Sequence, residues 1–572
     1  MTITEAIRPV RHSALWEVLR GSRKLSFAIV VLFHVAALVV MLQTETGWFG
    51  KTLYLLSWVF FNGLFILIVR RPGIAAALSL AIFTMLIVVS IFKSRAIWTT
   101  INFFDFVIID PDTVAFLLGI YPELSYFLLV GTAIGIPLLV LVWRIDVFRL
   151  PRAVGAALVL ASLACQIALS IPQPEQPEES FQGTNHISHF SRSGVLVVSE
   201  MMAGGWMEYE TMALGRLPLA ASEPCRPHGK PPNIIMVLDE ASFDITAVPG
   251  IKVPSGYGTH FQSFDNKSRK LVVEGAGGPT WYTEYNVLTG LAARSYRGLK
   301  FYVTRIAGDR VERGLPRALR RCGYQTFTLY PAYGAFLGAR RFQHTAGVER
   351  FIDLQDMKAQ FVEPDRYYYE QALRVLHNRD SRPKFVFIYT MANHFPWHER
   401  YLPGETPDWR GLGNSFDVDE YIRRQTMSAR DYIDFVARLK RDFPDEAFLI
   451  VRFGDHQPSL SRRIIDPSAD DAEIGRRFDA HDLRYFTTYY AIDTINFDPV
   501  DLSSALDRLE APYLPLVIQE AAGLPLDPSF VEQKKILERC LGVFYLCAGG
   551  NEARRFNRLL IDAGLIKGMV SR

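Results

Sequence analysis

Five long apolar runs in the first third of the chain restrict its fold more than any other feature of the sequence. At about 1.5 Å per residue in a helix, each run is roughly long enough to cross a hydrocarbon core of ~30 Å. We therefore predict an N-terminal transmembrane domain of five helical spans, at Leu25–Leu42, Leu53–Val69, Ile74–Phe92, Tyr126–Trp143 and Val154–Ile171.

The segment Ile97–Leu118, between the third and fourth runs, has a mixed character. It is rich in Phe and Trp but carries Asp105, Asp110 and Asp112. Aromatic rings favour the headgroup level of a bilayer, whereas carboxylates inside the hydrocarbon are costly. We predict an interfacial segment, and a sixth span is the alternative.

Arginine and lysine collect on one side of the five predicted spans. They precede the first span and lie between the second and third and between the fourth and fifth, at Arg8, Arg11, Arg20, Arg23, Lys24, Arg70, Arg71, Arg144, Arg149 and Arg152. The positive-inside rule makes that side cytoplasmic. No small-residue cleavage site follows the first span, so it reads as an anchor. We therefore predict a multi-pass protein of a bacterial inner membrane, with everything after Ile171 in the periplasm.

A proline-rich acidic stretch, Pro172–Glu179, separates the apolar part from the polar part and predicts a stiff linker. Short helices are expected between Ser191 and about Pro227. We divide the chain into a transmembrane domain at 1–171, a linker with juxtamembrane helices at 172–231, and a catalytic domain at 232–572.

Charge and cysteine content limit the classes of function. A formal net charge of +3 is too small to favour a nucleic-acid-binding protein. Four of the five cysteines, Cys225, Cys322, Cys540 and Cys547, lie in the polar part, where they allow three pairings. One or two disulfides are expected if that part is extracytoplasmic, and four free thiols are the alternative.

From Pro232 onward, short apolar strands alternate with amphipathic helices. The predicted strands are Asn233–Leu238, Lys270–Val273, Thr326–Leu329, Lys384–Thr390, Ala447–Phe453 and Tyr485–Ile492, and the predicted helices include Val311–Arg321, Tyr367–Asn378 and Glu420–Phe443. Strands separated by helices of this length favour a doubly wound α/β domain. Ligands in such sheets bind beyond the carboxyl ends of the strands.

Polar residues that bind metals or carry protons follow several of these strands. They are Asp239 and Glu240, Thr280, His394, and the pair Asp455 and His456. Imidazole and carboxylate together suit a divalent metal. Thr280 follows two glycines and opens a helix-like run, where free N–H groups could hold a phosphate. A threonine needs a base or a metal to become a nucleophile, so the predicted metal site and the predicted phosphate-binding turn at Thr280 support each other. Asp239 is expected to support Glu240 or to face solvent.

Three stretches together resemble a known family. Asn233–Glu240, Pro279–Thr280 and Gly454–His456 are similar to the metal-site motifs of the membrane-anchored branch of the alkaline phosphatase/sulfatase superfamily. That branch contains lipoteichoic acid synthases, periplasmic glucan phosphoglycerol transferases and lipid A phosphoethanolamine transferases. The five predicted spans match it as well, and the resemblance covers roughly Leu25 to Pro458.

The resemblance implies a mechanism. Glu240, Thr280, Asp455 and His456 would bind one divalent metal, Zn²⁺ or Mn²⁺, which would hold Thr280 as an alkoxide. Thr280 would attack the phosphodiester of a phospholipid headgroup, expel diacylglycerol and leave a phosphothreonine. A glycan or lipid hydroxyl would then accept the phosphoglycerol or phosphoethanolamine group. His394 matches a family histidine that contacts the phosphate or protonates a leaving oxygen.

Further candidates for substrate binding are Trp281, Arg340, Trp397 and His398. The two tryptophans either line the cleft or pack internally, and His398 is either a substrate contact or an exposed loop residue. In lipoteichoic acid synthases, a His, a Trp and an Arg hold the glycerol phosphate near the equivalent of Leu329–Leu337. Here Tyr330 and Leu337 replace the His and the Trp, and Arg340 or Arg341 keeps the Arg. The identity of the transferred headgroup is therefore left open.

Two other functions remain as alternatives. A metal-dependent phosphodiesterase or phospholipase would use the same groups with water as the acceptor. An inactive membrane scaffold would keep the fold without turnover, and the intact set of metal-binding residues argues against it.

Overall fold

The computed structural model describes residues 22–97, 100–108, 114, 118, 122–173, 183–212, 217, 225, 227, 229–360, 362–378 and 380–568. The basic residues before 22, Asp110, Asp112 and most of the proline-rich linker lie outside these residues. The chain divides into a helical unit, made of 1–107, 121–199 and 470–476, and an α/β unit, made of 108–120, 200–469 and 477–572.

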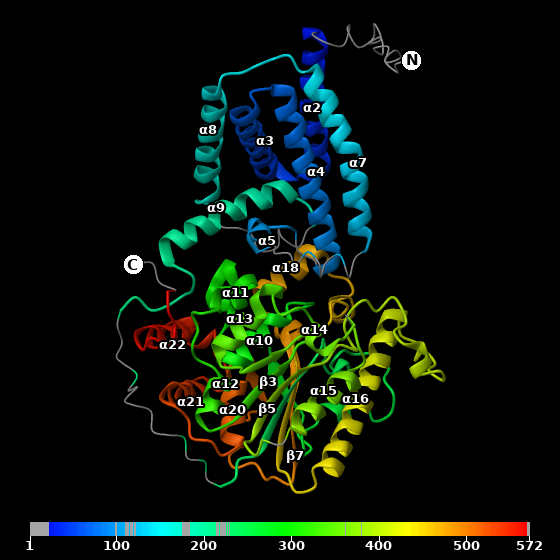
Figure 1. Cartoon of the computed structure of the whole chain (residues 1–572), viewed down its shortest axis with the longest axis vertical. Coiled ribbons are helices and arrows are strands. Elements are labelled where there is room, and N and C mark those ends of the chain that lie inside the picture. Colours follow the sequence, from blue (N-terminus) through cyan, green and yellow to red (C-terminus); the bar gives the residue numbers. More distant parts are fainter. Residues whose placement is uncertain are drawn as a thin grey trace, which may run out of the picture. The chain divides into compact units, whose positions relative to one another are not determined.

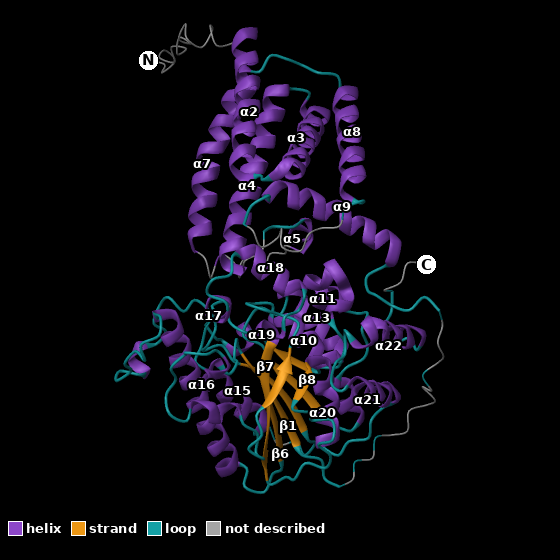
Figure 2. Cartoon of the chain, turned by 180° about the vertical axis from the view of Figure 1, so that it is seen from behind, coloured by secondary structure: helices purple, strands orange, loops and turns teal. Residues whose placement is uncertain are grey.

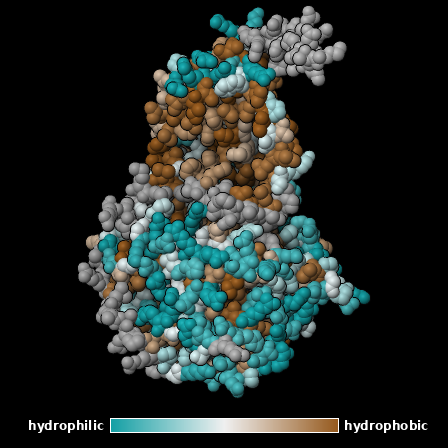
Figure 3. Space-filling model, viewed as in Figure 1, coloured by the Kyte–Doolittle hydropathy of each residue, from teal (hydrophilic) through white to brown (hydrophobic). Residues whose placement is uncertain are grey.

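Long apolar helices make up most of the helical unit (Figure 1). They are α2 (Arg23–Thr44), α3 (Gly47–Val69), α4 (Pro72–Ile97), α7 (Pro122–Ile145) and α8 (Arg152–Ser170), with α5 (Phe103–Ile108) and α9 (His186–Gly204) as additional helices. Among the described residues, five helices are long and apolar enough to cross a membrane, and they coincide with the five predicted spans. Apolar side chains cover the surface of this unit in Figure 3.

Small residues allow α3 and α8 to approach closely. A Cβ atom added at Gly63 would lie 3.0 Å from the carbonyl oxygen of Gly155, and one added at Gly155 would lie 2.6 Å from the nitrogen of Leu67. Close backbone contact of this kind drives helix association in lipid, where apolar side chains gain nothing by leaving the hydrocarbon. These two spans therefore pack closely against each other.

Polar contacts anchor α9 and α5 to the spans. The carboxylate of Glu45, between α2 and α3, accepts hydrogen bonds from the backbone N–H of Ile187 and from the Ser188 hydroxyl. Asp105 of the aromatic segment pairs with Lys93 at 2.8 Å. The Ile97–Leu118 segment adds no candidate span among the residues described. The predicted helical segment after Ser191 belongs to one helix that already begins at His186.

The α/β unit contains an eight-stranded sheet with the order β4-β3-β5-β1-β6-β7-β2-β8. Its strands are β1 (Asn233–Asp239), β2 (Arg269–Val272), β3 (Gln325–Leu329), β4 (Arg350–Ile352), β5 (Lys384–Tyr389), β6 (Phe448–Gly454), β7 (Thr487–Ile495) and β8 (Arg508–Glu510). All neighbouring strands are parallel except where β7 pairs with β6 and with β2. β1 and β5 are buried along their whole length, which explains why they read as continuous apolar runs.

Helices cover both faces of the sheet (Figures 1 and 2). α15 (Asp365–Leu376) and α16 (Phe416–Asp442) pack through Tyr369, Leu373 and Phe435 onto one face. On the other side lie α10 (Thr280–Thr289), α12 (Leu315–Arg321) and α20 (Leu514–Ala521). The other helices are α11 (Val303–Ala307), α13 (Ala339–Ala346), α14 (Leu354–Met357), α17 (Ser461–Ile465), α18 (Asp471–Asp479), α19 (Leu483–Phe486), α21 (Pro528–Cys540) and α22 (Asn551–Asp562). The predicted doubly wound α/β fold is confirmed.

Two disulfides connect segments of the α/β unit. They join Cys225 to Cys322 and Cys540 to Cys547. The first ties the approach to β1 to the end of α12, and the second closes a short loop after α21. Of the three pairings that the sequence allowed, the structure therefore selects one, with both bridges formed.

Candidate active site at the carboxyl edge of the sheet

The central strands of the sheet bring the predicted site residues to one edge. β1 lies between β5 and β6, and Asp239 at the end of β1 pairs with Gly454 at the end of β6. Glu240 therefore emerges beside Asp455, although more than two hundred residues separate them in the sequence. His394 follows β5 along the same edge. This is the position at which parallel α/β sheets bind ligands.

Glu240, Asp455 and His456 form a buried group that could hold a metal ion. One ligand atom from each lies within 4.8 Å of the others. The Thr280 hydroxyl is 3.5 Å from a Glu240 carboxylate oxygen and 3.4 Å from Nε2 of His456. Nε2 of His456 is also 3.2 Å from Oδ2 of Asp455. The structure thus brings together the four residues predicted to bind a metal.

The protonation pattern of this group fits a cation. Nδ1 of His456 lies 2.9 Å from the carbonyl oxygen of Gln457. Because a carbonyl can only accept, Nδ1 carries the hydrogen and Nε2 presents its lone pair to the carboxylates. Oδ2 of Asp455 is buried and has no hydrogen-bond partner among the described residues. A buried carboxylate oxygen without a donor is costly, and a divalent ion would satisfy it.

The burial of Glu240 and Asp455 and the repulsion between their carboxylates also favour a bound cation at this site. Burial, together with the negative charge of Asp455, raises the pKa of Glu240 well above its usual value. Burial also raises the pKa of Asp455. Two carboxyl groups in such a place resist ionising side by side unless a positive charge lies between them. The donor set of carboxylates, imidazole and hydroxyl suits a divalent metal ion.

A glycine turn places Thr280 against this group. Gly277 has φ of +78°, which favours glycine, and α10 begins at Thr280. The N–H of Gly277 donates to the carbonyl oxygen of Gln457 at 3.0 Å, and the Thr283 hydroxyl donates to the carbonyl oxygen of Asp455 at 2.6 Å. Since α10 is anchored to the loop after β6 at these two points, its first residue is held beside the metal-binding group.

His394 offers a lone pair and not a proton. Its Nδ1 donates to the carbonyl oxygen of Phe395 at 2.8 Å, which leaves Nε2 without hydrogen. Burial, against the opposing effect of the hydrogen bond with Phe395 and with smaller contributions from His456 and Arg424, lowers the pKa of His394 to about 4. The imidazole is therefore neutral near pH 7 and can accept a proton or a hydrogen bond.

The other predicted residues lie in varied surroundings. Asp239 is buried and accepts hydrogen bonds from His260 at 2.7 Å and from Tyr489 at 2.6 Å, so it does not face solvent. Trp281 is half-buried beside Phe301 and donates to its carbonyl oxygen at 2.8 Å.

Trp397 is packed, with 6% of its surface exposed, whereas the His398 side chain is 73% exposed. The Arg340 guanidinium pairs with Asp353 at 2.6 Å and with Asp356 at 3.3 Å. Contact between substrate and Trp281, Arg340, Trp397 or His398 stays a prediction.

Sequence reasoning did not identify Gln457 as part of the site. Its carbonyl oxygen holds both Gly277 and His456, and its side chain donates to the carbonyl oxygens of Arg484 at 2.8 Å and Thr487 at 2.7 Å. Part of the segment after Pro458, to which the sequence assigned no role, therefore supports the site. The only signal in the sequence is that Gln457 directly follows the Asp-His pair.

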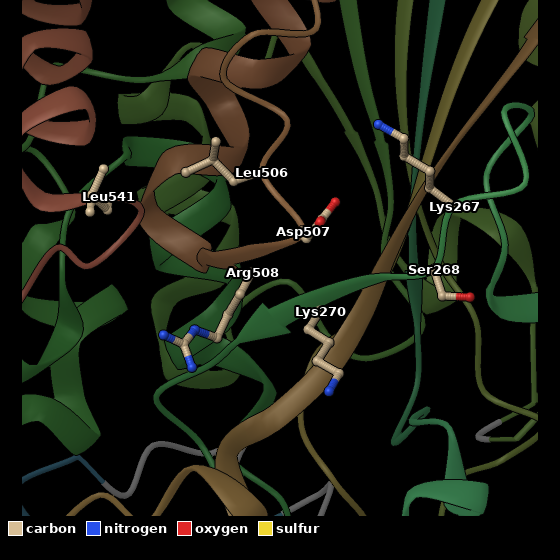
Figure 4. A pocket seen from close by; sticks show the side chains of 7 residues that line it. All are labelled: Lys267, Ser268, Lys270, Leu506, Asp507, Arg508 and Leu541. Atoms are coloured by element: carbon tan, nitrogen blue, oxygen red, sulfur yellow. The ribbon is translucent and has the colours of Figure 1, made fainter.

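A hollow of about 650 Å³ at the opposite edge of the sheet does not form a second site. Lys267, Lys270, Asp507 and Arg508 line it at the starts of β2 and β8. Figure 4 shows the amino groups of the two lysines and the guanidinium pointing in different directions. Side chains that diverge in this way cannot bind one anion together.

Comparisons with known proteins agree with this geometry. A family model described as Sulfatase matches residues 271–494, a range that includes Thr280, His394, Asp455 and His456. A search of curated protein sequences returns no match.

Three solved structures represent the similar folds. The phosphoglycerol transferase GacH of Streptococcus pyogenes, in complex with sn-glycerol-1-phosphate, has 16% identity and a TM-score of 0.47 over 62% of this chain and 90% of that chain. The lipoteichoic acid synthase LtaP of Listeria monocytogenes has 15% identity and a TM-score of 0.37 over 57% of this chain and 78% of that chain. The lipooligosaccharide phosphoethanolamine transferase EptA of Neisseria meningitidis has 13% identity and a TM-score of 0.47, over 87% and 95%.

The sulfatase match lies inside an α/β fold that carries the expected motifs, and five candidate membrane spans precede it. Residues 271–494 are therefore similar to the sulfatase family, in agreement with the resemblance that the motifs show.

Proposed function

We propose that the chain is a metal-dependent transferase that moves a phosphoryl headgroup, phosphoglycerol or phosphoethanolamine, from a phospholipid to a hydroxyl on a glycan or lipid. The observation that carries this proposal is the Thr280 hydroxyl, which lies 3.5 Å from Glu240 and 3.4 Å from His456 at the start of a helix. A divalent ion held by Glu240, Thr280, Asp455 and His456, Zn²⁺ or Mn²⁺, would supply Lewis-acid stabilisation of charge on the phosphoryl oxygens.

The residues of the chain suit two successive displacements. In the first, the Thr280 oxygen bonds to phosphorus, the bond from phosphorus to the diacylglycerol oxygen breaks, and diacylglycerol leaves with the proton that the Thr280 hydroxyl gives up. In the second, the acceptor hydroxyl oxygen bonds to phosphorus and the phosphothreonine bond breaks. His394 accepts the proton of that hydroxyl, because its imidazole is neutral and Nε2 is free of hydrogen.

The catalytic unit is proposed to act outside the cytoplasm, at the inner membrane of a bacterium. Two disulfides in the α/β unit support this location, because such bonds persist in oxidising compartments. The basic residues around the five candidate spans support the same orientation.

Substitution of Thr280 tests the chemistry. The purified protein, supplied with vesicles of phosphatidylglycerol and phosphatidylethanolamine, is expected to gain a phosphoglycerol or phosphoethanolamine adduct on Thr280, detected by mass spectrometry. Thr280→Ala removes the nucleophile and is expected to abolish both the adduct and the release of diacylglycerol. Thr280→Ser keeps a hydroxyl and is expected to retain part of both.

Full release of diacylglycerol by Thr280→Ala would refute the mechanism. Release that continues at the same rate without any glycan or lipid acceptor would instead identify water as the acceptor and the protein as a hydrolase.

A further inference from the structure

The loop that carries His394 is held rigidly by buried groups on α15 and α16. The carboxylate of Asp365 accepts hydrogen bonds from the backbone N–H groups of Met391 and Ala392, both at 2.9 Å. Asn393 donates from its side chain to Gln425 of α16 at 3.0 Å. These contacts fix the start of the loop, directly after β5.

Arg424 of α16 fixes the part of the loop that follows. Its guanidinium donates to the carbonyl oxygen of His394 at 2.7 Å, to that of Pro396 at 2.7 Å and to that of Glu399 at 2.8 Å. The same side chain donates through Nε to Glu420 at 2.7 Å. Arg424 is only 3% exposed. One buried cation thus gathers three carbonyl groups from a short segment around the candidate catalytic histidine.

The charges of α16 direct this cation toward the loop. Arg423 and Arg424 share the carboxylate of Glu420, so two buried positive charges face one negative charge. The remaining charge must be balanced by dipoles, since an unpaired buried ion is costly. The three loop carbonyls supply those dipoles. The planar guanidinium can serve them simultaneously, whereas the point charge of a lysine cannot.

Arg423 provides an internal comparison. It is fully buried and contacts the same Glu420, but its other contacts are the carbonyl oxygen of Tyr401, the Thr406 hydroxyl and the sulfur of Met427. These groups lie beyond the loop. The two arginines therefore have similar burial and charge, and they differ in the backbone segment whose carbonyl oxygens they bind.

We propose that Arg424 is a positioning residue for His394, and that it sets the place of the imidazole at the active site by holding the carbonyl oxygens of His394, Pro396 and Glu399. The inference rests on the proposed function, because it assigns His394 to the transfer reaction. Displacement of a reacting group by about 1 Å can reduce turnover by about 100-fold. Loss of the Arg424 contacts would move the backbone at His394 itself.

A double-mutant cycle tests this coupling. The full-length protein in detergent is given vesicles of phosphatidylglycerol and phosphatidylethanolamine together with an oligosaccharide as hydroxyl acceptor, so that the step assigned to His394 takes part in turnover. Steady-state release of diacylglycerol is then measured for Arg424→Lys, His394→Ala and the combined variant. If Arg424 acts through His394, Arg424→Lys lowers kcat by about 100-fold in the wild-type background. In the His394→Ala background the same change lowers it by no more than about 2-fold, because its target is already absent.

Arg423→Lys is the matched control. It is expected to lower thermal stability about as much as Arg424→Lys, while turnover stays within about 2-fold of the wild type. Equal losses of turnover in both arginine variants would refute the inference. Losses from Arg424→Lys and His394→Ala that multiply in the combined variant would refute it as well.

Chemical rescue provides a second measurement if Arg424→Lys folds poorly. Millimolar guanidinium ion is expected to restore part of the turnover of Arg424→Ala and none of that of the combined Arg424→Ala and His394→Ala variant. Equal rescue of both would refute the inference. Failure of the cycle while the Thr280 adduct still forms rejects the role of Arg424 alone, whereas full activity of Thr280→Ala rejects the proposed function.

Discussion

At the scale of single residues, Gly454 shows how closely the site is packed. A Cβ atom at this position would lie 1.8 Å from the carbonyl oxygen of Ser242, which is far inside contact distance. Gly454→Ala must therefore push apart the ends of β1 and β6, which carry Glu240 and Asp455. We expect a loss of stability of about 1–3 kcal/mol and a lower content of the proposed divalent metal, measured by unfolding and by elemental analysis.

Gly404→Ala is the control for this prediction. A Cβ atom at Gly404 would meet nothing within 4 Å, so this variant is expected to stay within about 0.5 kcal/mol of the wild type. Metal content unchanged in Gly454→Ala would contradict the role assigned to this contact.

The sequence predicted the side chains of the candidate metal site but not the groups that support them. Glu240, Thr280, Asp455 and His456 could be predicted because each follows a strand whose apolar pattern is readable. The side chains of Gln457 and Arg424 donate hydrogen bonds to main-chain carbonyl oxygens. No residue type in the sequence indicates which carbonyl oxygen will need such a donor. The partners of Asp239 were missed for a related reason, since His260 and Tyr489 reach it only through the tertiary fold.

At the scale of elements, α10 is a buried helix whose stability depends on pH. The carboxyl group of Glu284 is buried on it and accepts a hydrogen bond from Gln343 at 2.8 Å. Burial raises the pKa of Glu284 to about 7. The folded protein therefore binds a proton that the unfolded chain releases at lower pH. The stabilisation is complete below pH 4.5 and is lost as the pH rises through 7.

Glu284→Gln removes this ionisation while it keeps an acceptor for Gln343. Between pH 5 and 7, we expect the unfolding free energy of the wild type to fall more steeply than that of the variant, by up to about 1.4 kcal/mol per pH unit. Denaturant unfolding in detergent at several pH values measures both slopes. Asp445→Asn, at an exposed turn, is expected to keep the slope of the wild type, and parallel slopes for Glu284→Gln would refute the prediction.

The elements themselves could largely be predicted, with informative exceptions. Six strands were predicted near their observed positions, but β4 and β8 were missed because a strand of three residues shows no period. The helix predicted at Val311–Arg321 begins only at Leu315, since Val311 pairs with Ile566 in an isolated bridge. Local pattern gives no information about such a distant partner.

At the scale of the whole molecule, the two disulfides are expected to contribute unequally to stability. Cys225 and Cys322 are 97 residues apart, whereas Cys540 and Cys547 are separated by 7. In the chain-entropy model, a loop of about 100 residues is worth about 4.7 kcal/mol and one of this shorter length about 2 kcal/mol. Removal of the long-range bridge should therefore lower the thermal midpoint more.

The comparison uses Cys225→Ser with Cys322→Ser against Cys540→Ser with Cys547→Ser, each followed by thermal unfolding of the α/β unit. A larger loss from the second pair would contradict the chain-entropy account. The sequence could count the three pairings of these cysteines but could not choose among them, because the choice depends on which chain segments the sheet brings together.

The carbonyl oxygen of Gln457 is a shared acceptor whose two donors belong to different parts of the candidate site. One donor is the N–H of the turn that precedes Thr280, and the other is the imidazole that faces the carboxylates. Neither donor can shift without disturbing the hydrogen bond of the other. The proposed nucleophile and the proposed metal ligand are therefore positioned by the same acceptor, and a substitution that loosens one of these hydrogen bonds is expected to displace both groups.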